Sequence, residues 1–242
     1  MARLINSKSI LVNKGLRNEG SKKIIERLRK TKRNKDFVIG ISLARTNDST
    51  RADTEEGMND YINSLRSFVS SDIGDYYAIN ISCPNAFGGE SFAEPKLLDE
   101  LCTRLDMVSR TKPLYVKMPI SISDDLFARL LAVLDTHNVQ GVIIGNLQKD
   151  YSHIHPDDKK PESFCGGLSG APCRDRSSEL IIMTKSQYKN RFTIIGCGGV
   201  FSYQDAKEKF DAGADLIQLV TGMIYEGPGL VRKICKGLSN SL

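Results

Sequence analysis

Residues 76–85 read Tyr76-Tyr77-Ala78-Ile79-Asn80-Ile81-Ser82-Cys83-Pro84-Asn85, an apolar run that leads into a thiol between two carboxamides. Pro84 has no N–H to donate to a sheet ladder, so a strand that begins at Tyr76 must end near Cys83 and turn outward. Parallel α/β folds bind ligands at the carboxyl ends of their strands. These residues therefore predict a parallel strand that carries Asn80, Cys83 and Asn85 to a ligand site.

Similar apolar runs recur along the chain and alternate with amphipathic segments. Strands are predicted over residues 37–43, 76–82, 114–118, 141–145, 192–197 and 215–220. Helices are predicted near residues 19–33, 57–70, 95–108, 123–137, 175–190, 203–212 and 228–238. This repeat indicates an α/β fold with a parallel sheet. No linker interrupts it, so residues 1–242 are expected to form a single domain with one long loop at about 147–170.

The number of βα units limits the architecture. A closed β/α barrel has eight units, and only six are predicted here. Before the first predicted strand lies a short apolar piece at residues 10–16. The sequence therefore predicts an open sheet, or an incomplete barrel that begins within the architecture and leaves two strand edges exposed.

Composition and charge exclude several classes of protein. Of the 242 residues 40% are hydrophobic, and no apolar run reaches the length of about 18 residues that a membrane-spanning helix needs. The net charge of +5 comes largely from residues 22–35. Ile24, Ile25 and Leu28 recur there at helical spacing, so the basic side chains are interpreted as the solvated face of a helix and no nucleic-acid partner is expected.

The six cysteines form no C-x-x-C pair, which argues against a zinc site and against a secreted disulfide framework. A reducing cytoplasm fits this pattern best, and no metal site is predicted. Cys83 lies in the strand-end motif and is a candidate for chemistry. The others are expected to be small buried residues: Cys102, Cys165, Cys173, Cys197 and Cys235.

Three glycine-containing segments could let the backbone approach an anion: two precede predicted helices, and the third ends the last predicted strand. They cover residues 166–170, 194–200 and 219–222. Glycine allows positive φ and leaves N–H groups accessible, and barrels commonly bind phosphate in the loops after their last two strands. A dinucleotide fingerprint would need a third glycine where Phe201 stands, so NAD is disfavoured.

Lys117 is unusual because it lies inside the apolar run from Leu114 to Met118. A buried charge is costly unless it meets an opposite charge. The simplest partner for this side chain is an anionic ligand.

At these residues the chain resembles dihydroorotate dehydrogenase, the FMN enzyme of pyrimidine synthesis, from about residue 9 to 238. The matching motifs occur in the family's order at residues 80–85, 116–117, 167–170, 195–199 and 218–222. The resemblance implies a (β/α)8 TIM barrel of the FMN-binding type that lacks its first two βα units here. It also implies the oxidation of dihydroorotate to orotate in UMP biosynthesis.

The resemblance assigns a role to individual residues. Cys83 would be the base that removes the C5 proton of dihydroorotate while the C6 hydride passes to flavin N5. FMN would be contacted by Ser42, Asn80, Lys117, Gly145, Gly170, Gly199, Val220 and Thr221, the last four at its phosphate. Substrate would be held by Asn13, Asn80, Asn85 and Asn146. Carboxamides suit a ring with imide edges because they both donate and accept hydrogen bonds, and Lys117 would oppose the charge that grows on the reduced flavin.

The branch of the family and its partners follow from other residues. Residues 15–20 are similar to the quinone-dependent class 2, which implies quinone as acceptor and a cytoplasmic enzyme that touches the inner face of the membrane through an N-terminal segment missing here. Class 2 members usually carry Ser where Cys83 stands, and Cys is typical of class 1, so fumarate and NAD stay open as acceptors. Another FMN-barrel pyrimidine oxidoreductase and a truncated, non-catalytic relic also stay open.

Overall fold

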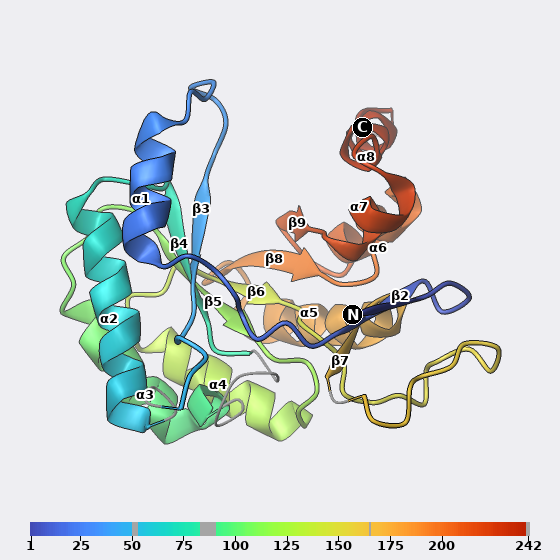
Figure 1. The fold of residues 1–242 in the computed structure, drawn as a ribbon, viewed down its shortest axis with the longest axis horizontal. Coiled ribbons are helices and arrows are strands. Elements are labelled where there is room, and N and C mark those ends of the chain that lie inside the picture. Colours follow the sequence, from blue (N-terminus) through green and yellow to red (C-terminus); the bar gives the residue numbers. More distant parts are fainter. Residues whose placement is uncertain (50–52, 83–90, 165, 241–242) are drawn as a thin grey trace.

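The computed structural model describes residues 1–49, 53–82, 91–164 and 166–240. Its main sheet has six parallel strands in the order β3-β4-β5-β6-β8-β9 (Figure 1). They are β3 (Gly40–Leu43), β4 (Tyr76–Asn80), β5 (Leu114–Met118), β6 (Gly141–Ile144), β8 (Thr193–Cys197) and β9 (Leu216–Gln218). All six predicted strands are confirmed, most of them slightly shorter than predicted. The sheet curls as part of a β/α barrel, and β3 and β9 are its open ends.

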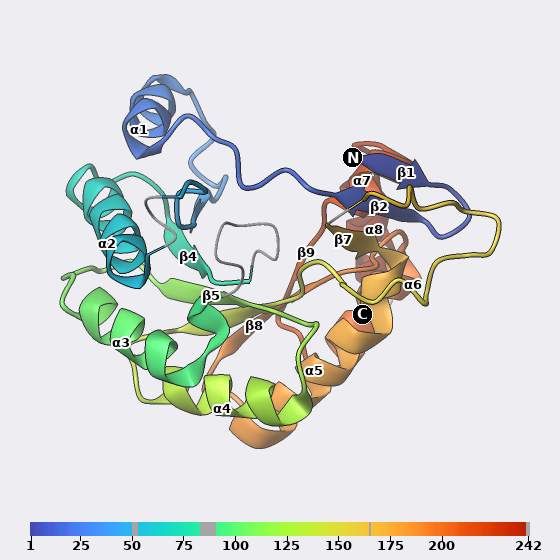
Figure 2. The same ribbon diagram turned by 60° about the horizontal axis from the view of Figure 1, so that its bottom comes forward.

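Helices connect the strands and cover the convex side of the sheet, where Figure 2 shows α2, α3, α4 and α5. The seven predicted helices are confirmed as α1 (Ser21–Lys30), α2 (Thr54–Ser70), α3 (Pro95–Asp106), α4 (Asp124–Asp135), α5 (Arg174–Tyr188), α6 (Tyr203–Asp211) and α8 (Leu230–Ser239). Capping residues set several starts. The side chain of Asp53 accepts hydrogen bonds from the N–H groups of Glu55 and Glu56, so α2 begins earlier than its apolar periodicity predicts.

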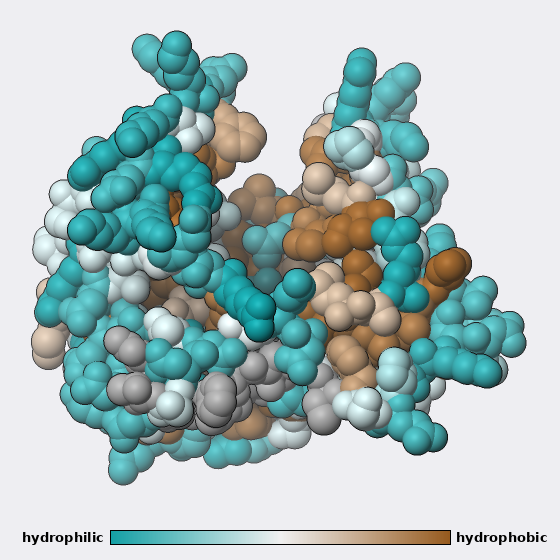
Figure 3. All heavy atoms as spheres, in the orientation of Figure 1, coloured by the Kyte–Doolittle hydropathy of each residue, from teal (hydrophilic) through white to brown (hydrophobic). Residues whose placement is uncertain are grey.

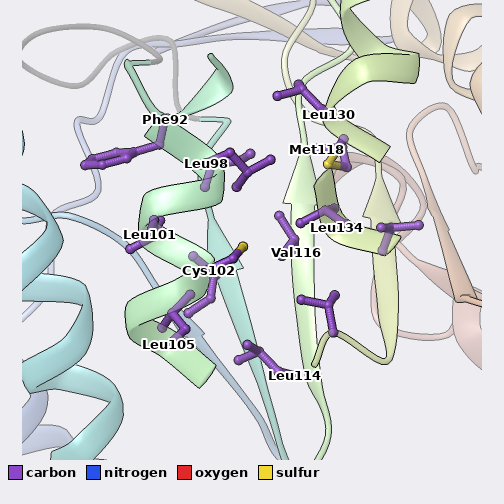
Figure 4. Packing of buried hydrophobic residues seen from close by; sticks show 14 of the residues in the cluster. Phe92, Leu98, Leu101, Cys102, Leu105, Leu114, Val116, Met118, Leu130 and Leu134 are labelled. Carbon is purple, nitrogen blue, oxygen red and sulfur yellow. The ribbon is translucent and has the colours of Figure 1, made fainter. Parts of the chain in front are cut away.

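The main core lies between the sheet and the helices of its convex side. Leu114, Val116 and Met118 of β5 are fully buried there. Figure 4 shows them packed against side chains of α3 and α4. Two of these, Leu101 of α3 and Leu134 of α4, are also fully buried. Each such side chain contributes about 1.5–3 kcal/mol on burial. Because successive strand residues point to opposite faces, the residues between them face the concave side.

A second, small antiparallel sheet was not predicted. It has the order β1-β2-β7, with β1 (Ala2–Leu4), β2 (Ser9–Val12) and β7 (Gly167–Gly170). The prediction that residues 166–170 form a loop is therefore wrong for the last four, which pair with β2 in the register Ser9↔Gly170. The reason is a partner strand that lies far away in the sequence, which local patterns cannot reveal. The long irregular segment between β6 and β7 agrees with the predicted loop.

A short helix, α7 (Thr221–Glu226), also escaped prediction, because residues 219–222 were interpreted as the end of a strand. Its Tyr225 hydroxyl lies 2.8 Å from the carbonyl oxygen of Leu4 and 2.7 Å from that of Ser9. These contacts hold α7 against the small sheet. Figure 3 shows the molecule hollowed between the α1 side and the α7–α8 side, with hydrophobic residues along the wall near α7.

The cysteine predictions hold only in part. Cys102 and Cys173 are buried as expected, whereas Cys197 is half-buried and Cys235 is exposed. Cys165 lies outside the described residues. In the described ranges, no helix combines the length and the apolar composition needed to cross a lipid bilayer.

Candidate active site

A cavity of about 290 Å³ lies at the carboxyl ends of the central and last strands of the main sheet. It brings together residues from β5, from the segments after β6 and β8, and from the β7 and α7 regions. The polar and glycine residues that line it are Lys14, Lys117, Asn146, Ser169, Gly170, Cys173, Cys197, Gly198, Gly199, Thr221 and Gly222. This is the edge at which parallel α/β folds bind ligands.

The structure brings half of the predicted site residues into this cavity. Those that line it are Lys117, Asn146, Gly170, Gly199, Val220 and Thr221. Those that the structure describes elsewhere are Asn13, Ser42, Asn80 and Gly145. Cys83 and Asn85 lie outside the described residues.

Ser42 and Gly145 have other positions. Ser42 is exposed within β3 and lines a separate groove at the open edge of the sheet, next to α1. Gly145 is buried with φ of 137°, and a Cβ there would lie 1.9 Å from the carbonyl oxygen of Cys197. A glycine is therefore required at this position by the close approach of β8, and the next residue, Asn146, lines the cavity.

Two predicted carboxamides meet at Ser82, which the sequence analysis did not single out. The side-chain oxygen of Asn80 accepts hydrogen bonds from the N–H (3.2 Å) and the hydroxyl (3.1 Å) of Ser82. The Asn146 side-chain nitrogen donates to the Ser82 hydroxyl (2.6 Å) and to its carbonyl oxygen. Ser82 is fully buried. Ser82 thus links the ends of β4 and β6 through hydrogen bonds. In the sequence, the one feature that pointed to this residue was its position inside the motif at residues 80–85.

Lys117 faces the concave side of β5, since its neighbours Val116 and Met118 face the helices. The apolar run around Lys117 predicted a deeply buried charge. The side chain is only half-buried, so the predicted extent of burial is wrong. The reason is the alternation of strand side chains between two faces. Its Nζ donates to Oε1 of Gln218 at 3.4 Å, and no carboxylate in the described part of the chain pairs with it. The ammonium is thus available to a ligand in the cavity.

The β8 loop, Gly198–Phe201, is fastened on its outer side. The carbonyl oxygen of Gly199 accepts hydrogen bonds from Nε (3.0 Å) and Nη2 (2.8 Å) of Arg174. The N–H of Phe201 donates to Oδ2 of Asp205 at 2.8 Å. Within the described ranges, no acceptor meets the N–H groups of Gly199 and Val200, and both residues line the cavity. Unpaired backbone donors of this kind can bind an anion.

The β7 side of the cavity is equally tight. Gly170 has φ of 89°, and a Cβ there would lie 2.3 Å from the carbonyl oxygen of Lys8. Next to it, the Thr221 hydroxyl donates to the Ser169 hydroxyl at 2.8 Å, and Ser169 in turn donates to the carbonyl oxygen of Ile10. The small sheet and the start of α7 are therefore joined at the cavity wall.

Two buried titratable groups lie close to this wall. Burial raises the pKa of the Cys173 thiol to about 12, so this thiol stays protonated near neutral pH and is a poor nucleophile. Burial lowers the pKa of the Lys209 ammonium to about 8. Sequence reasoning placed Lys209 only in an amphipathic helix and gave no sign of its burial. Across the described ranges, no cluster of three or more His, Cys, Asp or Glu side chains is arranged to hold a metal ion.

Fold and cavity together define the class: a β/α-barrel protein with a ligand cavity at the carboxyl ends of its parallel strands. Residues 1–242 match the model of a protein family described as dihydroorotate dehydrogenase. The chain belongs to the dihydroorotate dehydrogenase family.

Relatives agree with this assignment, and a solved structure agrees with the fold. The chain is 36% identical to a dihydroorotate dehydrogenase (quinone) of Nostoc punctiforme over 99% of its own length and 65% of the relative's length. It is 34% identical to the protein of the same name from Vibrio parahaemolyticus, over 98% and 70%. A crystal structure of DHODH from Eimeria tenella in complex with ferulenol has a TM-score of 0.85 at 22% identity, and the match covers 99% of this chain and 69% of that one. The chain thus spans about two thirds of the length of its relatives.

Proposed function

We propose that this chain carries the flavin-binding and substrate-binding side of an FMN-dependent dihydroorotate dehydrogenase, which oxidises dihydroorotate to orotate. The observation that carries the proposal is the convergence of Lys117, Asn146 and two glycine segments in one cavity. Lys117 and the glycine segments belong to the motifs on which the family resemblance was based, and the resemblance gives Asn146 a substrate contact. The names of the relatives support quinone as the electron acceptor. Residues 1–242 would act as one incomplete barrel domain.

The cavity fits the phosphate end of FMN. Among the described residues, none accepts a hydrogen bond from the N–H groups of Gly199 and Val200, and Thr221 and Gly170 line the same cavity. When bound, FMN would supply the acceptor for the hydride. The protein's own contribution is to bind the phosphate through backbone donors and to hold the flavin against the concave face of the sheet.

Lys117 would stabilise charge during the reaction. Its ammonium enters the cavity from β5, and its one partner among the described residues is the Gln218 amide. Negative charge grows on the reduced flavin ring, and a fixed cation in a partly water-excluded site opposes it. The interaction is stronger in the transition state than in the oxidised state, so it would raise the rate of reduction more than the affinity for flavin.

Asn80, at the end of β4, and Asn146, just after β6, would orient the substrate. Hydrogen bonds to Ser82 hold both carboxamides in fixed positions. Asn85 and Asn13 would complete the substrate contacts. Cys83 would accept the C5 proton. A free thiol has a pKa of about 8.5, so this role requires that the surroundings of Cys83 lower its pKa or relay its proton.

Flavin reduction tests the proposal directly. The purified protein should show a yellow flavin spectrum, and dihydroorotate should bleach it under anaerobic conditions. Absence of bound FMN and of any FMN affinity would overturn the proposal. Bleaching by other reduced pyrimidines but not by dihydroorotate would favour another pyrimidine oxidoreductase of the same fold. Reoxidation by quinone, fumarate or NAD then identifies the acceptor.

Substitution at Cys83 tests the base. Cys83→Ser should keep part of the bleaching rate, whereas Cys83→Ala should lose nearly all of it while FMN stays bound. Cys235→Ala is the matched control, since this thiol is exposed on α8. An undiminished rate in Cys83→Ala would show that another group removes the proton.

A further inference from the structure

A fully buried ammonium lies behind the β8 loop. Lys209 projects from α6 and has no solvent exposure. Its Nζ donates to the carbonyl oxygen of Arg174 at 2.7 Å and to the hydroxyl of Ser178 at 2.9 Å. Within the described part of the chain, no carboxylate pairs with it. A buried cation without a counter-ion is costly to the fold, so its presence calls for a reason outside packing.

Lys209 acts on the loop through Arg174. Lys209 fixes the backbone of the first turn of α5, and the Arg174 guanidinium reaches from that turn to the carbonyl oxygen of Gly199. The same guanidinium pairs with Oδ1 of Asp205 at 2.7 Å, and Oδ2 of Asp205 accepts the N–H of Phe201. The Lys209 network, defined here as Lys209, Arg174 and Asp205, therefore contains two cations and one anion.

The network sets the direction of the loop's free donors. The peptide between Gly199 and Val200 is trans, so its C=O and N–H point in opposite directions. Because the C=O points to Arg174, the N–H of Val200 points away from Arg174, and Val200 lines the cavity. A Cβ at Gly199 would lie 2.5 Å from the Cβ of Arg174, so the loop lies directly on the network. The two cations and one carboxylate of the Lys209 network therefore lie behind backbone donors that have no acceptor among the described residues.

We infer that Lys209 is a positioning residue whose buried charge, acting through Arg174 and the β8 loop, makes the site select a phosphorylated flavin over the same flavin without its phosphate. The inference rests on the proposed function, because it assumes that the cavity binds FMN. It adds a source of preference for phosphate at the β8 loop, which has no cationic side chain of its own. Arg174 orients the loop, and Lys209 contributes a charge that no carboxylate among the described residues contacts directly.

Binding should therefore depend on pH. The groups that face Lys209 are Arg174, Asp175, Cys173 and Cys197, and burial outweighs their effects, so the pKa of Lys209 falls to about 8. A bound phosphate dianion would stabilise the ammonium and raise that pKa. As pH rises above about 8, Lys209 loses its proton in the unliganded protein, and the preference for FMN over riboflavin should decline.

The stability of the unliganded protein should respond in the opposite sense. The pKa of Lys209 in the folded state is below its ordinary value of 10.5, so the unfolded chain binds more protons between about pH 8 and 10.5. The contribution of Lys209 to stability therefore increases as pH rises through this window. At neutral pH the charge opposes folding while it favours phosphate binding, a combination that a purely structural lysine would not show.

The test compares Lys209→Met with Lys207→Met, an identical change on the exposed side of the same helix. Dissociation constants for FMN and riboflavin are measured by flavin fluorescence on the intact chain, and unfolding of the unliganded protein is followed by circular dichroism. Lys209→Met should weaken FMN binding about tenfold, leave riboflavin binding unchanged, and leave the melting temperature equal or higher. Lys207→Met should change neither affinity. Between pH 7 and 9.5 the ratio of the two affinities should fall in the wild type and stay flat in Lys209→Met.

Each other outcome is decisive. An equal loss of FMN and riboflavin affinity in Lys209→Met would mean that the variant merely distorts the loop, and unchanged FMN affinity would mean that the charge has no role. Either result overturns the inference and leaves the proposed function intact, provided that the wild type binds FMN. If the wild type binds neither flavin, the proposed function fails and the inference fails with it.

Discussion

The convex and concave faces of the main sheet differ sharply although they are built from the same strands. On the convex face Leu114, Val116 and Met118 of β5 are fully buried against α3 and α4. On the concave face Lys117, from between two of them, enters the cavity and remains half-buried. α3 and α4 pack on the convex face, so that face provides stability, whereas the concave face carries the cavity that is open to a ligand. Substitutions should therefore separate folding from binding according to the face they affect.

The largest effect is expected on the convex face. Leu101 of α3 is fully buried in the core, so Leu101→Ala should lower the free energy of unfolding by about 2–5 kcal/mol. The affinity of the folded protein for FMN should not change. Urea unfolding and a flavin titration measure the two quantities. A large loss of flavin affinity without a loss of stability would contradict the separation of the two faces.

The converse is expected for the concave face. Lys117→Ala should slow flavin reduction by dihydroorotate about 100-fold, because the growing charge on the ring loses its counter-charge. The free energy of unfolding should change by no more than about 0.5 kcal/mol, as for other residues outside the core. Stopped-flow bleaching and urea unfolding test this, with Lys96→Ala on the exposed surface of α3 as control. Equal rates in Lys117→Ala and the wild type would remove Lys117 from the site.

Two glycines, Gly199 at the cavity and Gly20 away from it, allow a comparison of the same substitution at both positions. Gly199 and Gly20 both have positive φ, 74° and 84°, but a Cβ would meet Arg174 at Gly199 and nothing within 4 Å at Gly20. Gly20→Ala should therefore cost only the backbone strain, about 1 kcal/mol. Gly199→Ala should cost up to about 3 kcal/mol and weaken FMN binding as well. Thermal unfolding and flavin titration of both variants measure the difference. Equal costs at the two positions would show that the contact with Arg174 is easily relieved.

The smallest effect is expected at the rim of the sheet, which belongs to neither face. The Arg33 guanidinium and the N–H of Ile39 hold the pKa of Asp75 at about 2, below its ordinary value of 3.8. This contribution to stability is present above pH 3.8 and is lost as pH falls toward 2. Asp75→Asn should remove that part of the acid dependence without affecting FMN binding. Exposed pairs of this kind contribute about 0–1 kcal/mol. Identical acid unfolding curves for the two proteins would show that the pair contributes nothing.

Local patterns in the sequence predicted most of the architecture. The strands and helices of the βα repeat follow from apolar residues at periods of two and about 3.6, which depend only on near neighbours. The motif at residues 80–85 correctly marked the end of β4. β7 was missed because its ladder partner β2 lies at the other end of the chain, and Ser82 was missed because its function depends on carboxamides from two strands.

The sequence by itself determined the repeating strand–helix order, the incomplete number of units and the motifs that mark the carboxyl ends of the strands. Only the tertiary structure decided which lysine is buried. The apolar run around Lys117 predicted a buried charge there, yet its side of β5 faces an open cavity, whereas Lys209 is enclosed between α6 and the first turn of α5. Burial depends on which elements pack against each other over long distances, and local spacing carries no information about that packing.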